Sequence, residues 1–231
     1  MTATDGWGAL VTALASARVL AIVRYREGGD TLGALRAMAA GGVIAAEVTT
    51  QTPGWQDVVA SAAAEGIVVG VGTVTEHREV TDATAAGARF IVSPGLLPDV
   101  VAAALDRNLE PLPGVATASE ILLAQRAGVR LFKLFPAGAL GVDYLAQLRG
   151  PFPDLAFVPT GGVGLDDIRR WLDTGAFGVA LGSDLAGRSA PRSDAERAEL
   201  TRRAAAALAA SSQAAPADPG RLLTRAGRRT S

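Results

Sequence analysis

Short apolar runs recur along the chain, and each is followed by a break of small or polar residues and then by an Ala-rich amphipathic stretch. We predict eight strands at these runs, over residues 19–24, 44–49, 67–72, 90–93, 110–113, 131–135, 156–160 and 178–182. Helical spacing of apolar residues predicts helices over 31–40, 55–65, 76–86, 97–107, 117–127, 142–149 and 165–174. This alternation of strands and helices is typical of parallel βαβ units.

Several helix ends carry local signals of their own. Thr117 and Glu120 have the spacing of a capping box, which marks the start of a helix. Gly66, Gly87 and Gly128 follow predicted helices at the place where a left-handed C-terminal cap is expected. These signals support the predicted boundaries independently of the periodicity.

Eight strand–helix units in about 200 residues favour a single (β/α)8 TIM barrel, an α/β fold, over an open doubly wound sheet. A further helical pattern over 7–17 precedes the first strand and would cover the bottom of the barrel, and the last helix is expected over 194–210. We therefore expect one barrel domain over residues 1–210. Residues 211–231 are small, polar and Arg-rich, and we expect a flexible, solvated tail there rather than an anion-binding segment.

Composition excludes several kinds of chemistry. The 231 residues include no Cys and one His, which rules out disulfide scaffolds, thiolate metal sites and Cys nucleophiles and argues against a multi-histidine metal site or a Ser-His-Asp triad. The net charge of −1 does not indicate a nucleic-acid-binding protein, which would usually be basic. Neither a signal-peptide pattern nor a membrane-spanning apolar run is visible, so we expect a cytoplasmic protein without nucleic-acid or membrane partners.

The basic residues number 22, and Lys133 is the only lysine among them. Arginine stays protonated and cannot act as an amine nucleophile, so this exception is informative. Strand alternation places Lys133 on the same face as Leu131 and Phe135. If that face is the barrel interior, the loss of water favours the neutral amine, which could attack a ketone and form a Schiff base. The alternative is a structural ion pair with Glu47 in the core.

Glu47 is the only charged residue in the run 44–49. It would either pair with Lys133 or transfer protons in catalysis, and the two roles are compatible. The pairs Gly161–Gly162 and Gly182–Ser183 follow the last two predicted strands. Barrel enzymes often bind phosphate there, through backbone N–H groups and helix N-termini, although a tight turn explains either pair equally well.

Four other residues with possible chemistry have simpler explanations. His77 falls in the first turn of a predicted helix, where a solvated surface residue is expected. Trp7 and Trp171 fall on apolar helix faces, and Trp55 is close to the loop after the second strand. We expect packing roles for all three tryptophans.

The motifs resemble those of the 2-keto-3-deoxy-6-phosphogluconate (KDPG)/4-hydroxy-2-oxoglutarate (KHG) aldolase family over about residues 14–210. The stretches that carry the resemblance are Ala46-Glu-Val-Thr49, Gly70-Val-Gly-Thr-Val74, Phe90-Ile-Val-Ser-Pro-Gly95, Pro113-Gly114, Leu131-Phe-Lys-Leu-Phe-Pro136, Gly150-Pro-Phe-Pro153, Phe157-Val-Pro-Thr-Gly-Gly162 and Leu181-Gly-Ser183. The resemblance implies a class I (Schiff-base) aldolase on a TIM barrel, a homotrimer that uses no metal or cofactor. Its substrate would be a 2-keto-3-deoxy-6-phospho sugar acid, cleaved to pyruvate and glyceraldehyde 3-phosphate, or KHG, cleaved to pyruvate and glyoxylate.

Carried over motif by motif, Lys133 would form the Schiff base and Glu47 would be the general acid–base. The substrate-binding residues implied by the resemblance are Arg24, Gln51, Thr73, Pro94, Phe135, Thr160, Gly161, Gly162, Gly182 and Ser183. Among these, Thr73 would touch the keto-acid part of the substrate. The glycines and Ser183 would hold the phosphate.

The chain departs from the family pattern at one position. Many members have an arginine two residues after Glu-Val-Thr that contacts the substrate carboxylate, and here Gln51 stands there. Arg24 resembles an arginine of the phosphogalactonate branch and could supply the missing charge. Thr52-Pro-Gly-Trp55 and Gly182-Ser-Asp-Leu185 also resemble that branch, whereas Pro159-Thr160 resembles the phosphogluconate branch.

Three alternatives to a phosphogluconate-type aldolase therefore stay open. One is a 2-keto-3-deoxy-6-phosphogalactonate aldolase. Another is a phosphosugar isomerase or epimerase with Glu47 as its base and Lys133 in an electrostatic role. The last is a ligand-binding barrel without catalysis, in which Lys133 and Glu47 form a structural pair.

Overall fold

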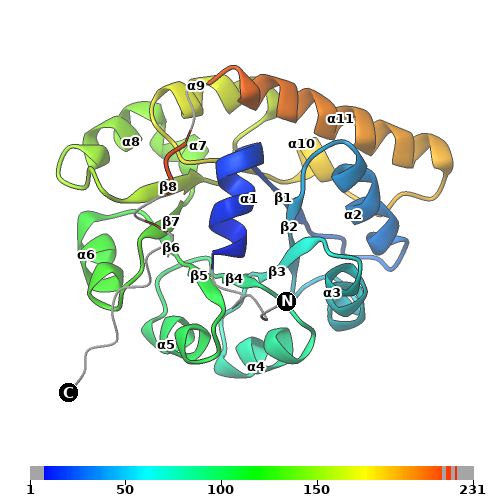
Figure 1. Ribbon diagram of the computed structural model, residues 1–231, viewed down its shortest axis with the longest axis horizontal. Helices are drawn as coiled ribbons and strands as arrows, with labels where there is room; N and C mark the ends of the chain where they lie inside the picture. Colours follow the sequence, from blue (N-terminus) through cyan, green and yellow to red (C-terminus); the bar gives the residue numbers. More distant parts are fainter. Residues whose placement is uncertain (1–7, 215–216, 220–221, 223–231) are drawn as a thin grey trace, which may run out of the picture.

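The computed structural model describes residues 8–214, 217–219 and 222 of the 231-residue chain. Strands form the inner layer of the molecule and helices lie around them (Figure 1). The strands of the described part are β1 Val19–Val23, β2 Ala45–Thr49, β3 Val68–Gly72, β4 Phe90–Val92, β5 Glu110–Leu112, β6 Gly114–Val115, β7 Leu131–Leu134, β8 Ala156–Pro159 and β9 Val179–Leu181. The result is an α/β fold with a curled, parallel arrangement of strands.

The strands pair in two parallel sheets. The larger has the order β5-β4-β3-β2-β1-β9, and the smaller has the order β6-β7-β8. An isolated parallel bridge between Thr160 and Ala180 connects the end of β8 to β9. All eight predicted strands are present, but the fifth divides at Pro113, because proline has no N–H to donate to a ladder. The short strand β6 after this proline was not predicted.

The helices lie between the strands, as the alternation predicts. They are α1 Ala9–Ala17, α2 Thr31–Ala40, α3 Trp55–Ala64, α4 His77–Ala85, α5 Pro98–Asp106, α6 Ala118–Arg126, α7 Ala137–Leu140, α8 Val142–Arg149, α9 Ile168–Asp173, α10 Ser183–Ala186 and α11 Asp194–Ser212. The helix predicted over 165–174 begins as the 3-10 turn Leu165–Asp167. The four-residue helices α7 and α10 were not predicted, because segments so short carry no helical period.

Both ends of the chain differ from the sequence prediction. Helix α1 begins at Ala9, and Trp7 is outside the described residues. Helix α11 continues to Ser212 rather than ending at residue 210, because the buried Ser211 hydroxyl donates to the carbonyl of Ala17 at 2.8 Å. Most of the predicted tail, residues 215–216, 220–221 and 223–231, is likewise outside the description, while Leu222 is buried.

The predicted caps are confirmed. The Thr117 hydroxyl accepts from the Glu120 N–H at 3.3 Å, and the Glu120 carboxylate accepts from the Thr117 N–H at 2.8 Å. Gly66, Gly87 and Gly128 have φ values of 81°, 79° and 93°. These left-handed values are strained for residues with a Cβ, so glycine is required at these helix ends.

Strand alternation divides the apolar residues into two clusters. Phe132 and Leu134 of β7 belong to the cluster that the strands share with the surrounding helices. Leu131, on the other face of β7, belongs to a second cluster together with Leu10 and Leu14 of α1. Helix α1 therefore packs on residues from the inner faces of the strands.

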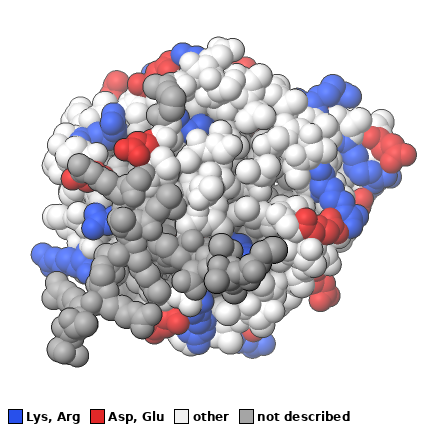
Figure 2. Space-filling model, in the orientation of Figure 1, with Lys and Arg blue, Asp and Glu red and all other residues white. Residues whose placement is uncertain are grey.

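Figure 2 shows the face of the molecule on which α1 lies. Where the described residues are visible, most of the charged side chains lie toward the edge of this face. No helix within the described residues is both long enough and apolar enough to cross a membrane.

Glu110, the first residue of β5, holds the N-terminus of α1. Its carboxylate accepts from the backbone N–H of Leu10 at 2.9 Å and of Val11 at 3.3 Å, in a buried setting. Burial raises the pKa of Glu110 to about 7, although these backbone hydrogen bonds pull it back down. The carboxylate supplies acceptors to N–H groups that a helix start leaves without partners.

Glu110→Gln should change how stability depends on pH. A folded-state pKa of about 7, against 4.5 for the ordinary carboxyl, means that the native protein prefers the protonated form. This contribution to stability is fully present below pH 4.5 and is lost as the pH rises through 7, a loss of about 3 kcal/mol. The variant lacks this loss. The difference between the free energies of unfolding of the variant and the parent should therefore shift in favour of the variant as the pH rises from 4.5 to 8. Urea denaturation across this range checks the expectation, and a constant difference would contradict it.

Candidate active site

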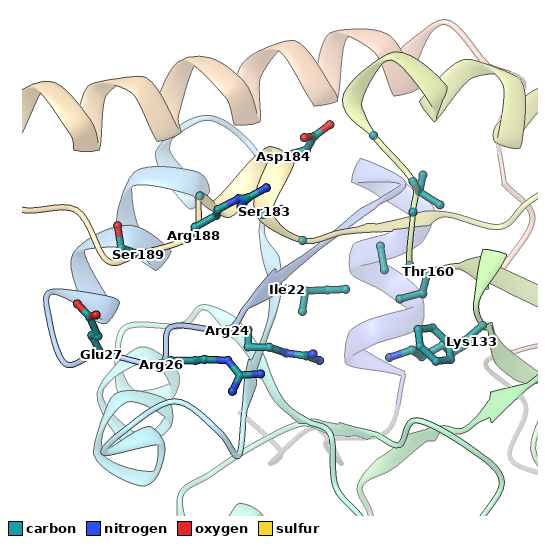
Figure 3. A pocket seen from close by; sticks show the side chains of 18 residues that line it. Ile22, Arg24, Arg26, Glu27, Lys133, Thr160, Ser183, Asp184, Arg188 and Ser189 are labelled. Atoms are coloured by element: carbon teal, nitrogen blue, oxygen red, sulfur yellow. The ribbon is translucent and has the colours of Figure 1, made fainter. Parts of the chain in front are cut away.

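A pocket of about 760 Å³ opens at the carboxyl ends of the strands (Figure 3). Its walls come from residues of β1, β7 and β9 and from the segments that follow β1, β7, β8 and β9. Eight of the residues proposed from the sequence line it: Arg24, Lys133, Phe135, Thr160, Gly161, Gly162, Gly182 and Ser183. Residues separated by more than 150 positions in the chain thus meet at one site.

Lys133 is buried at the inner edge of this pocket. Only 4% of the residue is exposed, and its Nζ is 5.2 Å from the centroid of the Phe135 ring. The ion pairs of the described residues do not include Lys133. The structural ion pair with Glu47, which the sequence left open, is therefore not formed, and the amine faces the pocket without an anionic partner in contact.

Glu47 is the middle residue of β2 and is almost completely buried, with 1% exposed. Neither of its carboxylate oxygens has a hydrogen-bond partner among the described residues. Burial raises its pKa, while the charges of Lys133 and Arg24 act in the opposite direction. A buried carboxyl group that lacks partners and has a raised pKa is suited to taking and giving protons.

The neighbouring strand leaves room for the Glu47 carboxylate through a glycine. A Cβ atom added at Gly72, at the end of β3, would be 2.6 Å from Oε1 of Glu47. Such a distance is too short for two atoms that are not bonded, so any larger residue at position 72 would push the carboxylate aside. Gly72 thus sets the position of Glu47.

Arg24 reaches the pocket from the end of β1. Its guanidinium donates to Oγ1 of Thr73 at 3.1 Å. Thr73 has a positive φ of 62°, an uncommon conformation for a β-branched residue, and the Thr50 hydroxyl donates to its carbonyl at 3.3 Å. Arg24 and Thr73 therefore form one connected unit beside the site.

Four of the proposed site residues are not pocket-lining: Glu47, Gln51, Thr73 and Pro94. Glu47 is buried, and Thr73 is linked to the pocket through Arg24. Gln51 and Pro94 are exposed and have no such connection. Of the two candidates for the carboxylate contact, the structure brings Arg24 to the pocket and leaves Gln51 outside it.

The turn after β8 presents two consecutive glycines to the pocket. Gly161 and Gly162 have φ values of 82° and 72°, and within the described chain the Gly162 N–H donates to no other group. A Cβ at Gly161 would be 2.8 Å from the ring of Phe135, so glycine is needed there for packing as well. The hydroxyl of Ser183, across the pocket, also has no hydrogen-bond partner in the described structure. These groups can donate to an anion.

Ten lining residues are not among the site residues proposed from the sequence, and five of these ten have polar side chains: Arg26, Glu27, Asp184, Arg188 and Ser189. Arg26 follows Arg24 by two positions, the spacing that puts two side chains on one side of an extended segment, and this signal was available. Arg188 carries no comparable signal, because it stands in a loop among many other arginines.

The remaining candidates have the places expected for them. His77 is exposed at the start of α4, and Trp55 and Trp171 are buried in the core. No three His, Cys, Asp or Glu side chains of the described residues gather in a way that could hold a metal ion.

Parallel strands that carry a buried amine and a buried carboxyl group beside a pocket are compatible with an α/β enzyme that acts on carbonyl compounds. A family model described as KDPG and KHG aldolase matches residues 10–201. The chain belongs to this family, and it is therefore a class I aldolase, a carbon–carbon lyase.

Individual relatives agree with the family match. The chain is 42% identical to a 2-dehydro-3-deoxy-phosphogluconate aldolase of Pseudomonas aeruginosa, over 68% of this chain and 72% of that protein. It is 30% identical to a 2-dehydro-3-deoxy-6-phosphogalactonate aldolase of Escherichia coli K12, over 80% and 93%. A KDPG aldolase from Legionella pneumophila, solved with pyruvate captured as a covalent carbinolamine intermediate, superimposes with a TM-score of 0.77 at 28% identity, covering 90% of this chain and 99% of that one.

Gly72→Ala should lower aldolase kcat by at least about tenfold while leaving the fold intact, because the new methyl group displaces the Glu47 carboxylate. The clash is with the end of a flexible side chain, so we expect a loss of stability of only about 1 kcal/mol. Steady-state kinetics and thermal unfolding of the variant check both parts. Gly28→Ala is the matched control, because a Cβ there meets nothing within 4 Å. Unchanged kcat in Gly72→Ala would show that the position of Glu47 does not matter.

Proposed function

We propose that this protein cleaves a 2-keto-3-deoxy-6-phospho sugar acid to pyruvate and glyceraldehyde 3-phosphate through a Schiff base on Lys133, and that it also cleaves KHG to pyruvate and glyoxylate. The observation that carries the proposal is the juxtaposition of the only lysine, buried and without an ion-pair partner, with a pocket and a buried glutamate whose oxygens have no partner within the described structure. Both groups lack the contacts that a purely structural role would supply.

The first half of the reaction forms the covalent intermediate. The neutral amine of Lys133 attacks C2 of the substrate ketone and gives a carbinolamine. Loss of water from this carbinolamine then leaves a protonated Schiff base. We assign the proton transfers of this dehydration to Glu47, acting directly or through one water molecule.

The second half breaks the carbon–carbon bond. Glu47 takes the proton of the C4 hydroxyl, the C3–C4 bond breaks, and its electron pair moves into the iminium to form an enamine on Lys133. The aldehyde product leaves. Protonation of the enamine at C3 and hydrolysis then release pyruvate and restore the free amine. The raised pKa of Glu47 suits a group that must accept a proton and return it in each turnover.

We assign the phosphate of the substrate to the two turns on the other side of the pocket. Gly162 supplies a backbone N–H group without another partner in the described chain, and Gly161, Gly182 and Ser183 complete the wall. Phe135 and Thr160 shape the pocket between these turns and Lys133.

A second candidate substrate, the phosphogalactonate isomer, is favoured by one observation. Arg24 lines the pocket and is held by Thr73, whereas Gln51 is exposed outside it. Arg24 resembles an arginine of the phosphogalactonate branch. It also lies where it can bind the substrate carboxylate. Comparison of the two C4 epimers as substrates decides between the candidates.

We further propose that the strands close into one (β/α)8 barrel with α1 across its lower opening. The bridge between Thr160 and Ala180 and the continuity of the chain through Pro113 support closure. The barrel domain would then end after Ser212, and the tail would follow. For the assembly we expect a cytoplasmic homotrimer, to which the exposed Leu122 and Leu123 of α6 would contribute apolar contacts.

Borohydride reduction in the presence of pyruvate tests the covalent step. The reduced adduct should map by peptide mass spectrometry to Lys133, since the chain offers only this side-chain amine beside its N-terminal amine. Lys133→Arg should give no adduct and no turnover while keeping the circular dichroism spectrum of the parent, because a guanidinium cannot form the Schiff base. More than a trace of activity in Lys133→Arg, or no adduct in the parent, would refute the mechanism.

Arg24→Ala should raise the pyruvate concentration needed for half-maximal rate in the condensation direction more than Gln51→Ala does. The increase in Arg24→Ala should be about tenfold larger than the increase in Gln51→Ala. This factor corresponds to the free energy of one charged hydrogen bond to a carboxylate. Initial rates at a fixed aldehyde concentration measure it. The reverse ranking would make Gln51 the main carboxylate contact.

A further inference from the structure

Three arginines line the pocket, and they differ in what they contact. Arg24 donates to Thr73, whereas no hydrogen bond or ion pair within the described chain involves the guanidinium of Arg26 or Arg188. In Figure 3 Arg26 is beside Arg24, while the Arg188 side chain extends toward Ser183. Arg188 is therefore the unpartnered cation on the side of the pocket that we assign to the phosphate.

The segment that carries Arg188 is fixed on both sides of it. Ala186 and Ala190 are buried, and Gly187 turns the chain between them with a φ of 78°. The hydroxyl of the buried Tyr25 donates to the carbonyl of Ala186 at 2.6 Å, which ties this segment to the end of β1. A cation held on such a frame loses less conformational entropy on binding an anion than one on a free loop.

The acidic residues of the pocket are engaged elsewhere. Glu27 pairs with Arg192 at 3.5 Å, and Oδ2 of Asp184 accepts from the Leu165 N–H at 3.3 Å. Neither acid forms an ion pair with Arg188 in the described structure. The positive charge of Arg188 is thus left for a ligand.

We propose that Arg188 binds the phosphate of the substrate and makes the enzyme prefer phosphorylated over unphosphorylated aldehydes; the inference rests on the proposed aldolase function and extends it. The glycine turn offers dipoles but no net charge, whereas a phosphate carries nearly two negative charges at neutral pH. A guanidinium supplies both charge and paired donors. Arg188 acts on binding only, and the chemistry at Lys133 does not depend on it.

The test compares two aldehydes in the condensation with pyruvate: glyceraldehyde 3-phosphate and glyceraldehyde. Arg188→Ala should lower kcat/KM for the phosphorylated aldehyde by at least about tenfold and change that for glyceraldehyde by less than about twofold. Arg188→Lys, which keeps the charge, should recover much of the loss. Arg78→Ala, which removes an equal charge from an exposed site on α4 that does not line the pocket, should change neither value.

Inorganic phosphate gives a second readout that does not depend on a phosphorylated substrate. It should inhibit the condensation of pyruvate with glyceraldehyde in the parent, and at least about tenfold more weakly in Arg188→Ala. Equal losses for both aldehydes, or undiminished phosphate inhibition in Arg188→Ala, would overturn the role of Arg188.

Borohydride trapping separates this failure from failure of the proposed function. Both the parent and Arg188→Ala should form the pyruvyl adduct on Lys133. If both proteins form the adduct and the variant still prefers the phosphorylated aldehyde, only the proposed role of Arg188 is refuted. If the parent forms no adduct, the proposed function itself is refuted.

Discussion

The removal of water from one amine and one carboxyl group is the constraint on which the rest of this structure depends. Lys133 and Glu47 are both buried, and the described residues provide neither with an ion pair or a side-chain hydrogen bond. Such burial opposes folding, because charged groups lose their hydration without compensation. The fold supports it with a large apolar core, and the same lack of water raises the pKa of Glu47.

The two-residue period of an extended chain builds the core and the site together. In β7 it directs Phe132 and Leu134 toward the helices and leaves Lys133 on the inner side. Just after β1 the same alternation places Tyr25 in the core and places Arg24 and Arg26 at the pocket. One geometric rule thus packs the layer of strands against the helices and directs polar side chains toward the pocket.

The fold was predictable wherever a pattern was long enough to show a period. All eight strand regions and the longer helices were found, whereas α7 and α10 are too short for a helical period, and the division of the fifth strand depends on a single proline, Pro113. The two extra residues of α11 depend on a contact between Ser211 and Ala17, which are distant in the chain. Such contacts leave no local signature.

The site was predictable to the extent that composition singled residues out. Lys133 is the only lysine, and Glu47 is the only charge in its strand, so both could be named from the sequence. Arg188 could not be named from the sequence. It differs from the other arginines by its place at the pocket, and the hydrogen bond from Tyr25 to Ala186 brings its segment there. Gln51 was named by analogy with a family position, yet the chain turns it outward after β2.

The packing of α1 on the inner faces of the strands has a consequence for how substrates and products enter and leave the pocket. Leu10 and Leu14 of this helix join the inner apolar cluster, and Glu110 anchors the helix start. The end of the molecule opposite the pocket is therefore filled, and the pocket is a blind passage with Lys133 at its inner edge. In the proposed mechanism the carbon–carbon bond breaks before the Schiff base is hydrolysed, so the aldehyde would have to leave this passage before the pyruvate that is still bonded to Lys133.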